Sequence, residues 1–197
     1  MLKTKPLPLD GPWADGFALD VHTTSSQYIG DDAYGHPQFE TVRSPVGEAL
    51  YQLKYRADKS VAAELCQTAA EFVKSKHWKP TLVVPVPPSR PGRHLQPVPL
   101  LAKGIAKLLD CPYGDKCLLK VKDTPELKSV YDYTERLEQL KGAYAVETDT
   151  TRDQDVLLVD DLYRSGATLE AATNALLRKG KATRVRALTF TRTRSNR

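Results

Sequence analysis

The chain has 197 residues, of which 41% are hydrophobic and 27% charged, and its formal net charge is +5. This length and composition suit one domain with a buried core and exclude a disordered or fibrous chain. No apolar run approaches the roughly 20 residues needed to cross a bilayer, and the segment Met1–Pro12 lacks the apolar core of a signal peptide. The three cysteines lack C-x-x-C spacing, which argues against a zinc site and a disulfide framework, so we expect a cytoplasmic protein.

The basic excess fits nucleic acid, but it fits equally a site that holds several phosphates. Most lysines and arginines are scattered among acids, as on an ordinary solvated surface. The one concentrated stretch lies near the C-terminus and comprises Arg184, Arg186, Arg192, Arg194 and Arg197. The sequence therefore favours a phosphate site over a dedicated nucleic-acid surface.

The first half of the chain predicts a mixture of strands and helices. Residues 1–16 are expected to be irregular, 17–29 to hold one or two strands, and 30–36 to form a turn. A helix is predicted from residue 58 or 60 to about residue 76, because its apolar residues recur at helical spacing. Thr81–Val86 is a short apolar run that predicts a buried strand ended by prolines.

The second half continues the alternation. Helices are predicted at about Pro99–Leu109 and at Thr168–Lys179, the latter closed by Gly180 in a left-handed conformation. Residues 121–142 are charged and poor in large apolar groups, which indicates a mobile loop with a helical turn around residues 133–139. Two further strands are predicted at residues 155–159 and 185–190. Strand, helix and strand in this order predict parallel pairing with a right-handed crossover.

The segment Val156–Thr168 reads VLLVDDLYRSGAT, an apolar strand followed by two acids and a small-residue turn into a helix. Such a turn at the carboxyl end of a strand suits an anion, because its N–H groups and the positive helix end face the ligand. Gly166 lets the backbone approach a phosphate closely, and the hydroxyl groups of the turn add donors. Asp160 and Asp161 would repel phosphate, so they suit sugar hydroxyls or magnesium. The pattern predicts a sugar 5-phosphate site; the alternative is that the acids merely end a strand.

This segment resembles the phosphoribosyl-pyrophosphate motif of type I phosphoribosyltransferases. It departs at Tyr163 and Arg164, where the family more often has an apolar residue and a Thr. The resemblance implies that Asp160 and Asp161 contact the ribose hydroxyls and hold Mg2+, directly or through water. It also implies that the 5-phosphate is bound by Arg164, Ser165, Gly166, Ala167 and Thr168.

The resemblance extends to the ComF-like (competence protein F-like) branch of the superfamily, over roughly residues 47–192. It is carried by LKY at 53–55, VVPVPPSR at 83–90, GRHLQ at 92–96 and KDTP at 122–125. The Cys-rich zinc segment of the branch is missing, and Gln96-Pro97 replaces its usual Asn-Gln. In the superfamily the loop after Val86 binds pyrophosphate, and a mobile loop brings positive charge to the leaving group. These roles fall on Pro88, Ser89, Arg90 and Arg93 in the first loop, and on Lys128 and Arg136 in the second.

The resemblance implies an α/β fold, a parallel twisted sheet flanked by helices. Residues 1–46 would form a small hood-like extension and residues 47–197 the phosphoribosyltransferase-like domain. The implied activity belongs to nucleotide metabolism: a magnesium-dependent transfer from phosphoribosyl pyrophosphate to a base-like or amine acceptor. The alternative is a non-catalytic binding protein with a regulatory or DNA-uptake role, which the altered acceptor-side residues and the basic C-terminus favour. The family often forms homodimers, and no membrane partner is expected.

Overall fold

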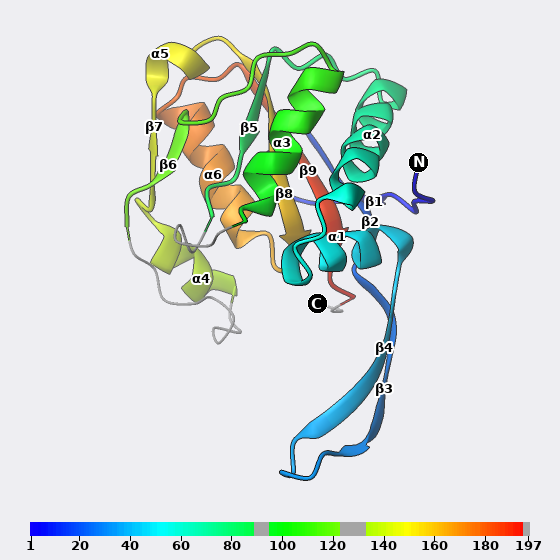
Figure 1. Ribbon diagram of the computed structural model, residues 1–197. Helices are drawn as coiled ribbons and strands as arrows, with labels where there is room; N and C mark the ends of the chain where they lie inside the picture. The colour runs from blue at the N-terminus through cyan, green and yellow to red at the C-terminus, as the bar shows by residue number, and fades with distance from the viewer. Residues whose placement is uncertain (89–94, 123–132, 195–197) are drawn as a thin grey trace.

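The computed structural model describes residues 1–88, 95–122 and 133–194 (Figure 1). Its central sheet contains β1 (Leu7–Pro8), β2 (Asp15–Val21), β5 (Leu82–Pro85), β8 (Asp155–Tyr163) and β9 (Arg184–Arg192). The strand order is β1-β2-β9-β8-β5, and all pairs are parallel except β1 with β2. The predicted α/β fold with a parallel sheet is therefore confirmed.

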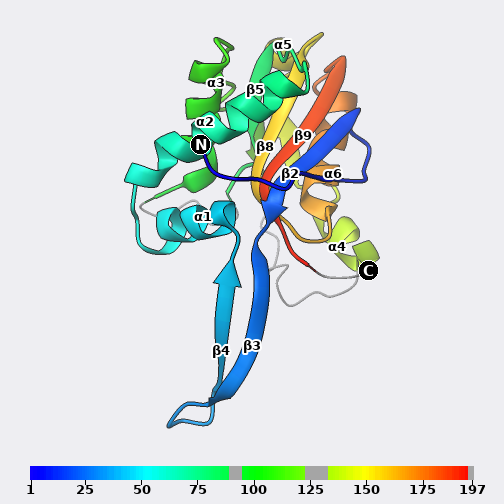
Figure 2. The same ribbon diagram turned by 90° about the vertical axis from the view of Figure 1, so that its right-hand side faces the viewer.

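Helices cover both faces of this sheet (Figures 1 and 2). One face packs against α1 (Pro45–Tyr55), α2 (Ser60–Ser75) and α3 (Pro97–Leu108). The other face packs against α4 (Tyr133–Leu140), α6 (Ala167–Arg178) and the small sheet of β6 (Leu118–Lys120) and β7 (Tyr144–Val146), which the short helix α5 (Thr148–Thr151) follows. Successive residues of β8 point to opposite faces, and both faces are buried, which explains its continuous apolar run. Within the described residues, no helix combines the length and apolar character that a bilayer crossing requires.

The predicted helices and strands of the second half are present, and two of the strands are longer than predicted. β8 continues through Asp160 and Asp161 to Tyr163, because its ladder with β9 continues beyond the apolar run. Asp160 pairs in register with Thr189, and the pairing extends to the last residues of both strands. The two acids therefore lie inside the strand and share its regular geometry.

The end of α6 differs from the prediction. The residue with a left-handed backbone there is Lys181, with φ of 55°, and Gly180 has no positive φ. A Cβ atom on Gly180 would lie 2.7 Å from both the Leu176 carbonyl oxygen and Thr151 Oγ1. Glycine is therefore explained at position 180 by close packing, and the turn conformation falls on its neighbour.

The first 46 residues contribute to the central sheet and to a projecting hairpin. β2 pairs with β9, so the sheet includes residues from both sides of the predicted boundary at residue 46, and β1 lies in the segment expected to be irregular. β3 (Thr23–Asp31) and β4 (Pro37–Arg43) form a two-stranded antiparallel hairpin that extends away from the body, as Figure 2 shows. We call residues 23–43 the arm. The turn predicted at 30–36 forms its tip.

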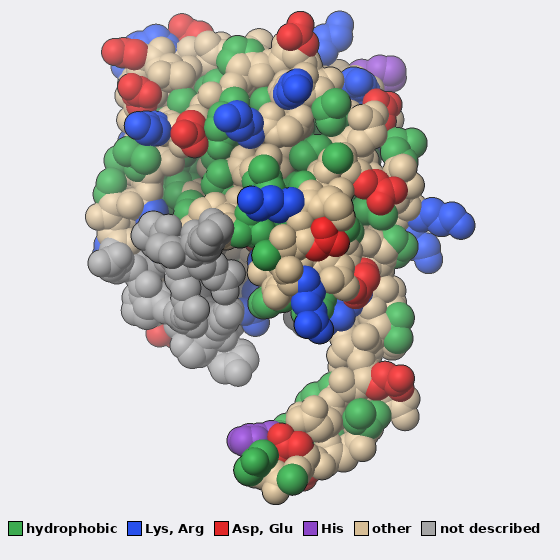
Figure 3. Space-filling model, in the orientation of Figure 1, with side chains coloured by type: hydrophobic (Ala, Val, Ile, Leu, Met, Phe, Trp, Pro, Cys, Tyr) green, Lys and Arg blue, Asp and Glu red, His purple; other side chains and the backbone are tan. Residues whose placement is uncertain are grey.

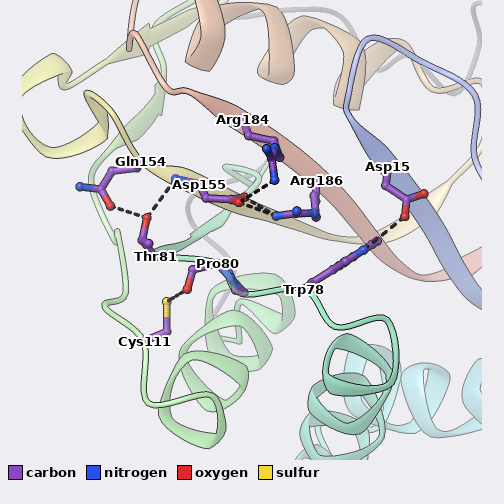
Figure 4. A network of polar contacts seen from close by, with 9 residues as sticks. All are labelled: Asp15, Trp78, Pro80, Thr81, Cys111, Gln154, Asp155, Arg184 and Arg186. Atoms are coloured by element: carbon purple, nitrogen blue, oxygen red, sulfur yellow. Dashed lines mark hydrogen bonds and ion pairs between the residues drawn. The ribbon is translucent and has the colours of Figure 1, made fainter.

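The amino end of the parallel sheet is closed by polar contacts (Figure 4). Arg186 Nη1 donates to both carboxylate oxygens of Asp155, at 2.5 and 2.6 Å, and Arg184 lies 3.5 Å from the same carboxylate. The backbone N–H of Asp155 donates to Thr81 Oγ1 at 2.9 Å. These contacts join β5, β8 and β9, and they engage two of the C-terminal arginines in the fold.

Candidate functional site

The two acids of the predicted site lie side by side at the carboxyl end of β8. Because neighbours in a strand point to opposite faces, Asp160 faces α6 and Asp161 faces α1. The Asp160 carboxylate accepts the Asp161 backbone N–H at 2.8 Å. The paired position in β9 is Thr189, whose buried Oγ1 has no partner within the described part of the chain. A buried hydroxyl without a partner is uncommon in folded proteins, so this end of the sheet retains unused hydrogen-bonding capacity.

Burial raises the pKa of Asp160 to about 8, and the negative charge of Asp161 adds to the increase. The N–H bond from Asp161 and the charge of Lys54 act in the opposite direction and are smaller. The first carboxyl group is therefore mostly protonated at neutral pH. It can donate a hydrogen bond, or it can ionise when a cation or a developing positive charge comes close.

Asp161 is ion-paired with a lysine from another element. Lys54 Nζ lies 2.8 Å from Asp161 Oδ2, and the two side chains are only 16% and 18% exposed. Lys54 stands in the last turn of α1, whose start is fixed by Ser44: its Oγ accepts the Gly47 N–H at 3.0 Å. The sequence predicted neither α1 nor this contact, although the LKY pattern at 53–55 marked the segment.

His22 stands next to this ion pair, directly after β2. Its Nδ1 lies 3.2 Å from Thr191 Oγ1, which donates to the Asp161 carbonyl oxygen at 3.2 Å. Burial lowers the pKa of His22, and the positive charges of Lys54 and Arg43 lower it further. The half-buried imidazole is therefore neutral at physiological pH and links β2 to β9.

The predicted phosphate loop joins β8 to α6 at the same sheet edge. Gly166 is the residue before the first turn of α6, and its φ is +86°. A Cβ atom there would lie 2.7 Å from the hydroxyl oxygen of Tyr163 and 2.9 Å from its ring. Only glycine therefore fits without strain. The first N–H groups of α6 have no partner within the helix, so they are available to an anion.

The side chains of the loop differ in exposure. Arg164 is exposed, Ser165 and Thr168 are half-buried, and Ala167 is buried. Ala167 and Thr168 begin α6, and Arg164 and Ser165 lie in the turn just before it. Their contact with a phosphate stays a prediction.

Tyr163 packs next to Gly166 and supports the loop. Its ring is buried, lies edge-on to Trp13 at 6.5 Å between centroids, and its hydroxyl donates to the Asp10 carbonyl oxygen at 3.4 Å. This packed position makes Tyr163 part of the core next to the loop. The large ring fills the space that the missing side chain of Gly166 leaves.

The remaining predicted residues are only partly described. Ser89, Arg90, Arg93 and Lys128 lie outside the described residues. Pro88 follows β5 and is half-buried, and β5 neighbours β8 in the sheet, so the predicted pyrophosphate segment begins beside the acids. Arg136 belongs to α4, which is joined to α6 by a hydrogen bond from the Tyr133 hydroxyl to Glu170.

The acidic pair fits a magnesium ion only as part of a larger complex. In the part of the chain that the structure describes, no group of three or more His, Cys, Asp or Glu side chains could hold a metal. Mg2+ keeps several waters and is usually held by one or two carboxylates together with phosphates of the substrate. Asp160 and Asp161 therefore fit an ion that arrives with a phosphate-rich ligand.

The fold and the arrangement of the site together define an α/β protein of a known family. Residues 58–197 match the model of the phosphoribosyl transferase domain, and the chain belongs to this family. The predicted resemblance to type I phosphoribosyltransferases and to their ComF-like branch is confirmed.

Two individual proteins illustrate the relationship. The competence protein ComFC of Bacillus subtilis (strain 168) is 29% identical over 156 residues, which cover 77% of this chain and 62% of that protein. Among solved structures, the glutamine phosphoribosylpyrophosphate (PRPP) amidotransferase from B. subtilis, complexed with ADP and GMP, aligns with a TM-score of 0.51 at 16% identity. That alignment covers 81% of this chain and 34% of the other, and it shows the fold alone. The chain spans less than two thirds of either relative.

Proposed function

We propose that this protein binds phosphoribosyl pyrophosphate and transfers its phosphoribosyl group to a base-like or amine acceptor, with Mg2+ and with release of pyrophosphate. The observation that carries the proposal is the juxtaposition of the acid pair on β8 with the Gly166 turn at the start of α6. The acids suit a sugar diol and the turn suits a phosphate. A ribose 5-phosphate offers both groups on one small molecule.

The order of the strands indicates how the donor would be oriented along the carboxyl edge of the sheet. The 5-phosphate would bind the first N–H groups of α6, and the ribose hydroxyls would face Asp160 and Asp161. β5 neighbours β8 on the side away from β9, so the chain leaves the sheet toward Pro88 beside the acids. The pyrophosphate would extend toward that segment, where positive charge from Arg90 and Arg93 is expected.

The reaction requires little covalent chemistry from the protein. The bond between C1 of the ribose and the pyrophosphate oxygen breaks, and the electron pair leaves with pyrophosphate. Positive charge develops on the ribose, the acceptor nitrogen attacks C1, and the acceptor then loses its proton. Asp160 and Asp161 hold the ring and stabilise part of this charge. Magnesium, held by the donor oxygens and by these two acids directly or through water, would neutralise charge on the leaving group.

Lys54 acts in this proposal as a positioning residue. Its ion pair holds the Asp161 carboxylate in one orientation before the donor binds. A ribose hydroxyl that donates to Asp161 has to share that carboxylate with the ammonium group. Lys54 then lies close enough to the donor to favour its negative charge.

Calorimetry with the donor and Mg2+ tests the binding step. The wild-type protein is expected to bind, and the double variant Asp160→Asn with Asp161→Asn is expected to lose binding, because the near-isosteric amides cannot ionise to balance Mg2+ or the developing positive charge. Asp149→Asn, an exposed acid on α5, serves as the control and should bind as the wild type does. Absent binding by the wild type, or unchanged binding by the double variant, contradicts the proposal.

A second candidate function is donor binding without catalysis, in a regulatory or DNA-uptake role. It is favoured by the 29% identity to a protein named as a competence protein. Pyrophosphate release with any nitrogenous acceptor would count against it, whereas salt-sensitive DNA binding without turnover would support it. Arg197 lies outside the described residues. The other basic C-terminal residues are spread along β9, with Arg186 engaged at the amino edge and Arg194 beyond the carboxyl edge, so these four form no single patch.

A further inference from the structure

The arm differs in charge from the rest of the molecule. It contains three acids, Asp31, Asp32 and Glu40, and one basic residue, Arg43 at its base. The whole chain has 29 basic and 24 acidic residues, so the remainder has a formal net charge of +7. Figure 3 shows Lys and Arg side chains interspersed with Asp and Glu across the body face that carries α3, and an acidic, histidine-bearing tip on the arm.

The arm also exposes an unusual share of large apolar side chains. In the described part of the chain, ten large hydrophobic side chains are exposed, and half of them belong to these 21 residues. They are Tyr28, Ile29, Tyr34, Phe39 and Val42, with exposures of 53%, 62%, 86%, 55% and 53%. Aromatic and aliphatic groups gathered on a projection are typical of a protein-binding surface.

The arm is ordered by its own contacts. Tyr28 and Phe39 are opposite each other across the two strands, with ring centroids 5.7 Å apart. At the tip, Asp32 Oδ1 accepts the backbone N–H groups of Tyr34 and His36 at 2.8 and 2.9 Å. A two-stranded ribbon with both faces in water is nonetheless marginally stable, so a further surface is needed to support it.

The base of the arm is fastened to the body. Ser44 Oγ donates to the Val21 carbonyl oxygen at 2.6 Å, and Arg194 donates to the Thr24 carbonyl oxygen. The backbone N–H of His22 donates to the Arg192 carbonyl oxygen at 2.7 Å. The arm therefore has a fixed root at the carboxyl edge of the sheet, beside the acid pair, and its length projects away from the chain's own body (Figure 2).

We propose that the arm binds the basic body of a second copy of this chain, so that two copies form a dimer joined by two arms. Opposite charges attract, and the arm and the body carry opposite net charges. A twofold axis makes the contact twice, because each copy supplies one arm and one body. The negative charge of the arm disfavours nucleic acid as its partner, since phosphates would be repelled.

The test measures the mass of the full chain in solution by light scattering after size exclusion and by sedimentation over a concentration series. The wild type is expected to be dimeric at low salt, with weaker association as salt increases. The triple variant Ile29→Thr, Tyr34→Ser and Glu40→Lys changes exposed side chains of the arm only. Its dimer dissociation constant is expected to rise at least about tenfold, because it loses apolar contacts and reverses one charge.

A matched control makes the same kinds of change elsewhere. Leu119→Thr, Val121→Thr and Glu138→Lys alter exposed residues outside the arm and should leave the association unchanged. Circular dichroism checks that each variant is folded, and replacement of residues 24–42 by a short Gly-Ser turn gives a second route should the triple variant unfold. A monomeric wild type at low salt, or a dimer that persists without the arm, overturns the proposal. Association of the arm only with a different basic protein overturns it as well.

Discussion

Both ends of β8 carry aspartates, but the two ends differ in how fully these carboxyl groups are paired within the protein. At the amino end, Asp155 accepts two bonds from Arg186, and Thr81 completes the network. At the carboxyl end, Asp160 has a raised pKa, and the neighbouring Thr189 hydroxyl is buried without a partner among the described residues. Carboxylates that are satisfied by the protein stabilise the fold, whereas carboxylates left short of partners are available to a ligand.

A large effect on stability, without an effect on donor binding, is expected at the amino end of β8. Asp155→Ala leaves the Arg186 guanidinium, only 13% exposed, without its carboxylate. We expect the free energy of unfolding to fall by about 2–4 kcal/mol, measured by urea denaturation. Donor affinity of the folded variant should match that of the wild type. Asp149→Ala is the control for a lost surface charge. A weakened donor affinity in Asp155→Ala would contradict the view that the amino end of β8 serves stability alone.

The carboxyl end is tested by Gly166→Ala. The added methyl group meets the Tyr163 hydroxyl and the backbone is held at φ of +86°. We expect donor affinity to fall about 10- to 100-fold, with a stability loss of about 1–3 kcal/mol. Gly35→Ala is the matched control, because Gly35 has φ of +78° and open space around it. If both variants bind the donor equally well, the loop at Gly166 is not the phosphate site.

A smaller effect is expected for Lys54→Met, which removes the cation and keeps the aliphatic length. Asp161 then lacks its partner, so we expect a stability loss of about 1–2 kcal/mol. The double variant with Asp161→Asn should recover most of this loss, and a double-mutant cycle measures the coupling between the two side chains. If the stability losses of the two single variants simply add, the ion pair between Lys54 and Asp161 does not position the Asp161 carboxylate.

The last of these stability tests concerns pH. The pKa of Asp160 in the fold, about 8, exceeds its ordinary value of 3.8, so the folded state retains a proton that the unfolded chain loses. The wild type therefore loses stability as pH rises from about 4 to about 8. Asp160→Asn should lack this slope, and its melting temperature relative to the wild type should be highest above pH 8. Equal melting temperatures for the two proteins across this range would contradict the raised pKa.

The same group predicts a pH dependence of binding. A ligand that carries Mg2+ favours the ionised form of Asp160, so the donor should bind more tightly as pH rises toward about 8. Calorimetry in buffers of different ionisation enthalpy measures the proton that is released. Asp160→Asn should release none, and equal proton release from both proteins would assign the proton to another group.

Local patterns predicted the site better than its surroundings. The apolar run before Asp160 and the small-residue turn at Gly166 are contiguous in the chain, so their geometry follows from short-range rules. The pairing of Lys54 with Asp161 depends on how α1 packs against the sheet, which no local pattern contains. The arm was predicted in part: one or two strands were expected before the turn. The returning strand was not predicted, because it lacks the apolar alternation of a half-buried strand and both of its faces are exposed.

The packing that supports the loop between β8 and α6 limits how far the chain can be truncated from its N-terminus. The family match begins at residue 58, yet Trp13 supports Tyr163, and β2 covers the edge of β9. A chain that starts at residue 58 would expose the backbone N–H and C=O groups along β9, and such an open edge invites aggregation. It would also lose Lys54. The part of the sequence by which the family is recognised is therefore smaller than the part that must fold together.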